Sequence, residues 1–197
     1  MQIPAHKKKI MIHCLATPPG WGKHKDAEQM VAEVRLWHTQ DRGWSDIAYA
    51  EVVDYEGRSA PGRDLNNDGS TFDDTGAGAK GHNEDTIHIA LAGGRWPDGT
   101  WGSRRDKFSD HFTPEQNRQL RESIARINRL AGRELKVLGH NEVDPSKGCP
   151  AFDVQEWLNA TPVADFAFPR PVAGKNPFVA ILNAIFRALG FGKGGPV

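Results

Sequence analysis

Short apolar runs alternate with helical stripes of apolar residues over the first 160 positions of the chain. Four of the runs combine β-branched and other apolar residues and predict strands: residues 8–14, 46–58, 85–94 and 134–140. The second run turns at Glu56 and Gly57, and two glycines end the third.

Three further segments have the residue spacing of helices. Residues 26–38 place five apolar side chains on one helical face: Ala27, Met30, Val31, Val34 and Trp37. Residues 112–132 carry signals for both helix ends: Thr113 as N-cap, Pro114 at the first helical position, Gln116 in a capping box and Gly132 at the C-terminal end. Residues 152–160 predict a last short helix. Strands that alternate with helices predict one α/β or α+β domain over residues 1–160, with a central sheet of about five strands and helices packed on it.

The pattern changes near residue 160. Residues 161–175 are rich in proline and alanine and predict an extended linker. Residues 176–197 predict a basic amphipathic helical tail, with an apolar stripe at Phe178, Ile181, Leu182, Ile185 and Leu189. This helix is shorter than the roughly 30 Å core of a bilayer. Two interpretations stay open: the tail lies in an anionic membrane interface, or its stripe packs back onto the domain.

The charge balance and the cysteine content exclude several classes of protein. The 197 residues include 25 basic and 25 acidic side chains, so the formal net charge is zero. The overall charge therefore does not favour a nucleic-acid partner. Two cysteines, Cys14 and Cys149, do not make a disulfide scaffold. The N-terminal apolar run is too short for a signal peptide, so we expect the protein to be made in the cytoplasm. We also expect it to be a monomer.

Three side chains are candidates for a metal site. His13 and His140 stand at the ends of two predicted strands, and Cys149 follows in the segment "GHNEVDPSKGCPAFDV". A catalytic zinc commonly has three protein ligands of this kind and an open fourth position. Side chains alternate across a strand, so Cys14 faces away from His13 and is expected to pack as a small buried residue. On spacing alone, ordinary structural roles for these histidines remain open.

The chain also resembles the zinc-dependent N-acetylmuramoyl-L-alanine amidases of the bacteriophage lysozyme type, relatives of the peptidoglycan recognition proteins. The matching segments follow one another in order over residues 8–158: "IHCLATP", "WHTQDRGWSDIAYAEVVDYEGR", "GRDL", "GAKGHNEDTIHIALAGG", "FTPEQNRQLR" and "GHNEVDPSKGCPAFDV". The resemblance implies one zinc held by His13, His140 and Cys149, with Tyr49 and Lys147 as catalytic residues. It also implies a single mixed sheet with a groove over the zinc.

The function implied by the resemblance is that of a phage endolysin. Its substrate would be bacterial peptidoglycan, cut at the amide between N-acetylmuramic acid and L-alanine of the stem peptide. The enzyme would reach the cell wall after release through the inner membrane. Two alternatives are a catalytically silent peptidoglycan-binding module and an amidase-like carrier whose tail perturbs membranes. Silent relatives typically lack the metal cysteine, so Cys149 favours an active enzyme.

Other polar residues have alternative interpretations. His82 and Asn83 are candidates for the substrate groove, whereas His88 lies within a strand and is expected to be a satisfied sheet residue. Relatives often carry histidine where this chain has Ala50 and Gly78, which puts substrate contacts in doubt. Tyr49 and Lys147 could otherwise be an ordinary strand aromatic and an exposed loop lysine.

Residues 64–75 partly match a calcium-binding loop. Asp64, Asn66, Asp68 and Gly69 occupy the first, third, fifth and sixth places, but Thr75 stands where a bidentate glutamate belongs. The alternative is a polar surface loop of Asx turns. A calcium site is therefore the weaker expectation.

Overall fold

The computed structural model describes residues 2–160. These residues belong to one compact unit. The predicted linker 161–175 and the predicted amphipathic tail 176–197 lie outside the described residues. Within residues 2–160, none of the helices has the length and hydropathy that a bilayer span requires.

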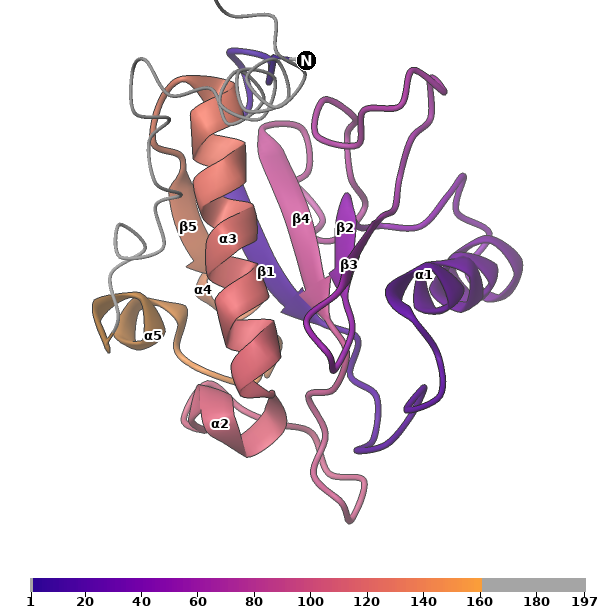
Figure 1. The fold of residues 1–197 in the computed structure, drawn as a ribbon, viewed down its shortest axis with the longest axis vertical. Helices are drawn as coiled ribbons and strands as arrows, with labels where there is room; N and C mark the ends of the chain where they lie inside the picture. The colour runs from indigo at the N-terminus through magenta and orange to yellow at the C-terminus, as the bar shows by residue number, and fades with distance from the viewer. Residues whose placement is uncertain (1, 161–197) are drawn as a thin grey trace, which may run out of the picture. The chain divides into compact units, whose positions relative to one another are not determined.

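A five-stranded mixed sheet forms the centre of the molecule, as the sequence predicts (Figure 1). Its strands lie in the order β3-β2-β4-β1-β5. Their bounds are β1 Lys9–Cys14, β2 Glu51–Val53, β3 Ser59–Pro61, β4 Thr86–Leu91 and β5 Lys136–Gly139. β4 and β5 pair with β1 in parallel, β2 pairs with β4 in parallel, and only β3 is antiparallel to its neighbour. Parallel pairing places the C-terminal ends of β1, β4 and β5 at one edge, where loops leave the core.

Helix α3, Pro114–Ala131, covers one face of the sheet (Figure 1). Its buried residues Leu120, Ile124 and Ile127 belong to the same apolar cluster as Ile10 and Ile12 of β1. The predicted ends of this helix are confirmed. The Thr113 and Gln116 side chains form the capping box, and Gly132 ends the helix in the left-handed conformation.

Helix α1, Ala27–Leu36, packs against the other face, near β2 and β3. Its residues Met30, Val31 and Val34 share a cluster with Val52, whereas the adjacent Val53 belongs to the α3 cluster. The two valines point to opposite faces because side chains alternate along a strand. A short π-helical turn, η1 (Trp37–Asp41), continues α1.

Over the middle of the sheet, the α1 side carries a smaller apolar cluster than the α3 side. It contains Met11 of β1, Leu138 of β5 and Ala79 of the loop before β4. Met11 pairs with His88, and His13 pairs with Ala90, so all four side chains share this face. Here two histidines are buried in the sheet instead of aliphatic residues.

The predicted strand 46–58 is shorter in the structure. Residues before Glu51 are irregular because side chains accept the backbone N–H groups: Asp46 accepts from Ile47, and His38 Nδ1 accepts from Ala48 at 3.1 Å. The chain then turns back at residues 54–58 and adds β3. These acceptors come from side chains, so the apolar pattern alone did not predict the break.

Three short helices complete the described structure: α2 Phe108–His111, α4 His140–Val143 and α5 Val154–Ala160. Helix α5 is the predicted last helix, whereas α2 and α4 were not predicted. His140 is the first residue of α4, directly after β5, and not the last residue of a strand.

Candidate metal centre

His13, His140 and Cys149 converge at the C-terminal edge of the sheet. Each offers one ligand atom, and these three atoms lie within 4.8 Å of one another. Within residues 2–160 this is the one such group of three or more histidine, cysteine or acidic side chains.

The register of β1 and β5 explains why the two histidines meet. Ile12 of β1 pairs with Gly139 of β5, and His13 and His140 are the residues that follow this pair. The centroids of the two imidazole rings are 4.9 Å apart. The parallel pairing therefore brings the side chains of His13 and His140, which are far apart in the sequence, next to each other.

Backbone contacts hold Cys149 beside them. Asn141 donates its backbone N–H to the carbonyl oxygen of Cys149 at 2.8 Å. The backbone of Gly148 approaches the carbonyl oxygen of Gly102 so closely that a Cβ atom at residue 148 would collide with it. The Cys149 Sγ then lies 3.6 Å from His13 Nδ1. The Gly148–Cys149 sequence thus permits a turn that a larger residue at 148 would disturb.

The donor set and its spacing fit zinc. Zn–N and Zn–S bonds in a tetrahedral site place neighbouring ligand atoms about 3.3 to 3.8 Å apart, and the distance from Cys149 Sγ to His13 Nδ1 is 3.6 Å. Burial, together with the charges of His88 and His140, lowers the pKa of His13 well below its usual value, so its imidazole is neutral. Burial raises the pKa of the Cys149 thiol, so binding of a metal to this sulfur is coupled to loss of a proton.

Cys14 lies outside this group of ligand atoms. Its side chain is buried within the apolar cluster on the α3 face. Its backbone N–H donates to Cys149 Sγ at 3.3 Å. Cys14 therefore contacts Cys149 through its backbone N–H and also through its thiol, and the hydrogen bond between the two thiols lowers the pKa of Cys14.

Tyr49 and Lys147 lie around the three candidate ligands. The ring centroid of Tyr49 is 5.2 Å from that of His13. Burial raises the pKa of Tyr49 above its usual range, so its hydroxyl is protonated at neutral pH. Lys147 is exposed. Burial of His140 is the main cause of its lowered pKa, and the positive charge of Lys147 lowers that pKa further. The Lys147 ammonium group is therefore near this ligand.

The candidate groove residues have different roles in the structure. Asn83 holds the loop before β4, because its Oδ1 accepts the backbone N–H of Ala79 at 2.8 Å. His82 is half-buried, and its charge contributes to the lowered pKa of His140. Glu142 accepts the N–H of Gly139 at 2.7 Å and so caps α4.

Two residues at the site were not predicted to contribute to it: His88 was expected only as a satisfied sheet residue, although its Nε2 has no partner within residues 2–160, and Asn141 was not singled out. His13 Nε2 lies 2.9 Å from His88 Nδ1, and both side chains are buried. Asn141, which is also buried, donates through Nδ2 to the carbonyl oxygen of Phe152 at 3.3 Å. A signal for His88 was present, since a histidine inside the apolar strand "TIHIAL" needs a polar partner.

Residues 64–75 contain the Asx turns expected of a polar surface loop. The Asp64 carboxylate accepts the backbone N–H groups of Asp68 and Gly69, and Asp68 accepts that of Ser70. These are turns stabilised by aspartate side chains. The carboxylates are therefore engaged with their own backbone.

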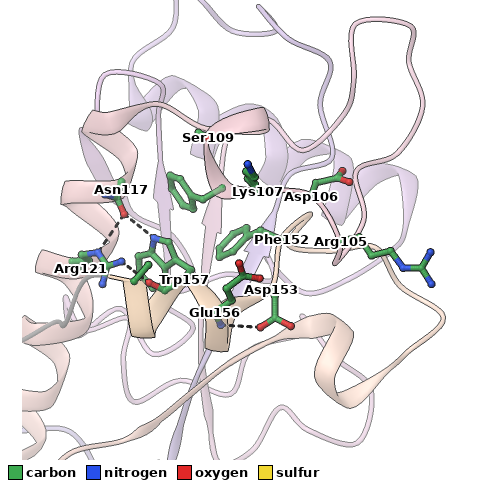
Figure 2. Close-up of a pocket in the computed structure, with 12 residues that line it drawn as sticks. Arg105, Asp106, Lys107, Ser109, Asn117, Arg121, Phe152, Asp153, Glu156 and Trp157 are labelled. Atoms are coloured by element: carbon green, nitrogen blue, oxygen red, sulfur yellow. Dashed lines mark hydrogen bonds between the residues drawn. The ribbon is translucent and has the colours of Figure 1, made fainter.

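A separate pocket of about 400 Å³ lies among α2, α3 and α5 (Figure 2). Phe108, Phe152 and Trp157 give it apolar walls. The guanidinium of Arg121 stacks on the Trp157 ring at 3.9 Å and donates to the Trp157 carbonyl oxygen. None of the three candidate metal ligands lines this pocket, so it is distinct from the metal centre.

Comparisons with known proteins identify the family and the fold of the chain. No protein-family model matches the chain. The endolysin of Escherichia phage T7 is 36% identical over 149 residues, which cover 75% of this chain and 83% of the T7 protein. The endolysin of Enterobacteria phage T3 is 34% identical over 154 residues, which cover 78% of this chain and 86% of the T3 protein.

Solved structures share the fold at lower sequence identity. The N-acetylmuramoyl-L-alanine amidase LysC of Clostridium intestinale has a TM-score of 0.56 at 18% identity, covering 81% of this chain and 89% of LysC. The Drosophila peptidoglycan recognition protein PGRP-LB has a TM-score of 0.60 at 22% identity, covering 83% of this chain and 84% of that protein. The chain therefore belongs to the family of phage endolysins that includes those of T7 and T3, and it has the fold of the N-acetylmuramoyl-L-alanine amidases and peptidoglycan recognition proteins.

Proposed function

We propose that this endolysin hydrolyses the amide between N-acetylmuramic acid and L-alanine of the stem peptide, with one zinc ion held by His13, His140 and Cys149. The convergence of these three side chains in a chain of this family is the observation that carries the proposal. Zinc bound there would lower the pKa of a water molecule toward about 7 and polarise the substrate carbonyl.

The protein's own groups supply the rest of the chemistry. Amide hydrolysis develops negative charge on the carbonyl oxygen and requires a proton on the leaving amine. The Lys147 ammonium and the Tyr49 hydroxyl are two donors beside the ligands, and the raised pKa of Tyr49 keeps its proton available. We assign both residues to stabilisation of the oxyanion, and one of them to proton transfer. We also assign His82 and Asn83 to the substrate groove.

A catalytically silent peptidoglycan-binding module is the alternative from another class. The convergence of Cys149 with two histidines favours the enzyme, because peptidoglycan binding alone needs no half-buried thiol beside neutral imidazoles. Digestion of purified peptidoglycan separates the two functions. The amidase releases stem peptides with a free L-alanine amino group, and chelation of zinc stops that release. The binding module sediments with peptidoglycan and releases nothing.

The setting of the reaction is part of the proposal. The enzyme acts as a monomer, is made in the host cytoplasm and reaches the cell wall after release through the inner membrane.

The basic amphipathic segment 176–197 contacts anionic membranes. Truncation after Ala160 is expected to abolish binding to anionic liposomes while digestion of purified peptidoglycan continues. A truncated protein that digests peptidoglycan and still binds liposomes as well as the full chain would contradict the membrane role.

A further inference from the structure

We propose that His88 positions the metal ligand His13 by accepting a hydrogen bond from its Nε2, and so keeps His13 Nδ1 open to the metal. This inference rests on the proposed zinc site. His88 is a positioning residue, because it acts through His13 and is not one of the three candidate ligands.

The sheet places the two imidazoles side by side. Met11 pairs with His88, and His13 pairs with Ala90, so the two histidines are diagonal neighbours on one face of β1 and β4. Each is 1% exposed, and His13 Nε2 lies 2.9 Å from His88 Nδ1. Because the two rings are excluded from water, each is the other's polar partner at this contact.

The two nitrogens of His13 face different groups. Nε2 faces His88, whereas Nδ1 lies 3.6 Å from Cys149 Sγ. A metal bound at Nδ1 uses the lone pair of that nitrogen, so the ring proton must be on Nε2. His88 Nδ1 then accepts that proton in a hydrogen bond, and His88 carries its own proton on Nε2. Only this pair of tautomers satisfies the contact and also leaves the ligand atom free.

The backbone of the loop before β4 holds His88 in place. A Cβ atom at Gly78 would lie 2.6 Å from His88 Nδ1 and 3.0 Å from His13 Nε2. A Cβ atom at Gly76 would collide with His88 Cδ2 and lie 2.9 Å from the carbonyl oxygen of Ala48. The two glycines in "GAGAKG" therefore let the backbone pack directly against the histidine pair. A side chain at residue 78 and the imidazole at residue 88 would compete for the same space.

His88 is costly as a packing residue alone. Its Nε2 is buried and has no hydrogen-bond partner within the described residues. An aliphatic side chain would fill this position in the sheet without leaving a buried polar atom unpaired. The hydrogen bond with His13 is a reason for an imidazole at position 88.

Substitutions at His88 separate positioning from packing. His88→Asn retains an acceptor, because Asn Oδ1 falls near the place of imidazole Nδ1, whereas His88→Leu fills the space without one. The matched control is His111→Leu, which removes a buried imidazole bonded to Asp106 at 2.8 Å outside the candidate ligand group. Zinc affinity is measured by competition with a chelator for all three variants and the unmodified protein.

The expected result is a zinc Kd raised by about 10- to 100-fold in His88→Leu, the scale found when the partner of a ligating histidine is lost. His88→Asn is expected to recover most of that loss, and His111→Leu is expected to lower the melting temperature without changing the Kd. If His88→Leu binds zinc as tightly as the unmodified protein, or if His88→Asn is as weak as His88→Leu, the positioning role is wrong. If His88→Leu does not fold, His88→Ala takes its place in the comparison.

A second readout uses the zinc-free protein. Long-range ¹H–¹⁵N correlation spectra are expected to show His13 with its proton on Nε2, and to show a mixture of tautomers in His88→Leu. A His13 proton found on Nδ1 in the unmodified protein would overturn the inference. This readout stands even if the unmodified protein does not bind zinc, and absence of zinc binding would contradict the proposed function instead.

Discussion

The backbone N–H of Asn141 donates to the carbonyl oxygen of Cys149 at 2.8 Å, so the residue after His140 holds the backbone of Cys149. The Asn141 side chain extends this contact, because Nδ2 donates to the carbonyl oxygen of Phe152 at 3.3 Å. Two of the three candidate ligands are thereby fixed relative to each other by one buried residue.

Asn141→Asp is expected to weaken zinc binding. The substitution keeps the size of the side chain but replaces the Nδ2 donor with an oxygen that repels the Phe152 carbonyl. We expect the zinc Kd to rise by about 10-fold or more, with a lower melting temperature. The control is Asn128→Asp, because Asn128 uses its Oδ1 to accept the N–H of Leu135, and aspartate keeps that acceptor. Equal zinc affinities for the two variants would contradict the role of Asn141.

The two cysteines are expected to differ in their effect on the metal. Cys149→Ser should lose most of the zinc and the activity, because a hydroxyl is a poor replacement for a thiolate. Cys14→Ser should retain zinc but melt at a lower temperature, because its hydroxyl enters the apolar cluster under α3. Metal content by atomic emission and thermal unfolding measure the two effects. Loss of zinc from Cys14→Ser together with its retention by Cys149→Ser would reverse the assignment.

Tyr49→Phe and Lys147→Ala are expected to impair turnover without removing zinc. Each loses one donor to the developing oxyanion, which corresponds to a fall in kcat of about 100-fold or more. Tyr55→Phe and Lys136→Ala are matched controls, because the Tyr55 hydroxyl contacts the Pro18 carbonyl and Lys136 lies exposed on β5. If either test variant has the same kcat as its control, the substituted residue does not take part in the mechanism.

The zinc-free protein is expected to lose stability as the pH falls from about 6.5 to about 4. Burial lowers the pKa of His38 from 6.5 to about 4, with smaller contributions from the charges of Arg42 and Arg63. Between these two pH values the unfolded chain binds the proton and the folded chain does not, so protonation favours unfolding by up to about 1.4 kcal/mol per pH unit.

His38→Asn keeps an acceptor for the Ala48 N–H and removes the titration of residue 38. Its free energy of unfolding, measured with urea in the presence of a chelator, should depend less steeply on pH than that of the unmodified protein; equal slopes would contradict this assignment.

Local signals made parts of this fold predictable from sequence. The ends of α3 follow from Thr113, Gln116 and Gly132, which act within a few residues of one another. The placement of Cys14 on the α3 face follows from alternation along β1. The ends of two predicted strands indicated where His13 and His140 would lie, because parallel strands end at the same edge.

Contacts between distant residues were not predictable in this way. The strand expected at residues 46–58 begins only at Glu51, because the His38 side chain accepts the N–H of Ala48. The pairing of His13 with His88 depends on the register of β1 against β4, which apolar alternation alone does not determine. Sequence therefore gave candidates for the metal ligands but not the residues that hold them in position.

Hydrolysis of peptidoglycan in water enriched in ¹⁸O tests the central claim most directly. Cleavage of the amide between N-acetylmuramic acid and L-alanine should place one ¹⁸O atom in the lactyl carboxylate of the sugar product and release a peptide with an unlabelled L-alanine amino terminus. Mass spectrometry of both products, with zinc-loaded protein and with the Cys149→Ser variant as the negative control, measures the label and the bond that is cut. The proposal predicts labelled muramic acid from the zinc-loaded protein and far less of it from the variant. Label at a glycan reducing end, or at a peptide crosslink, would contradict it.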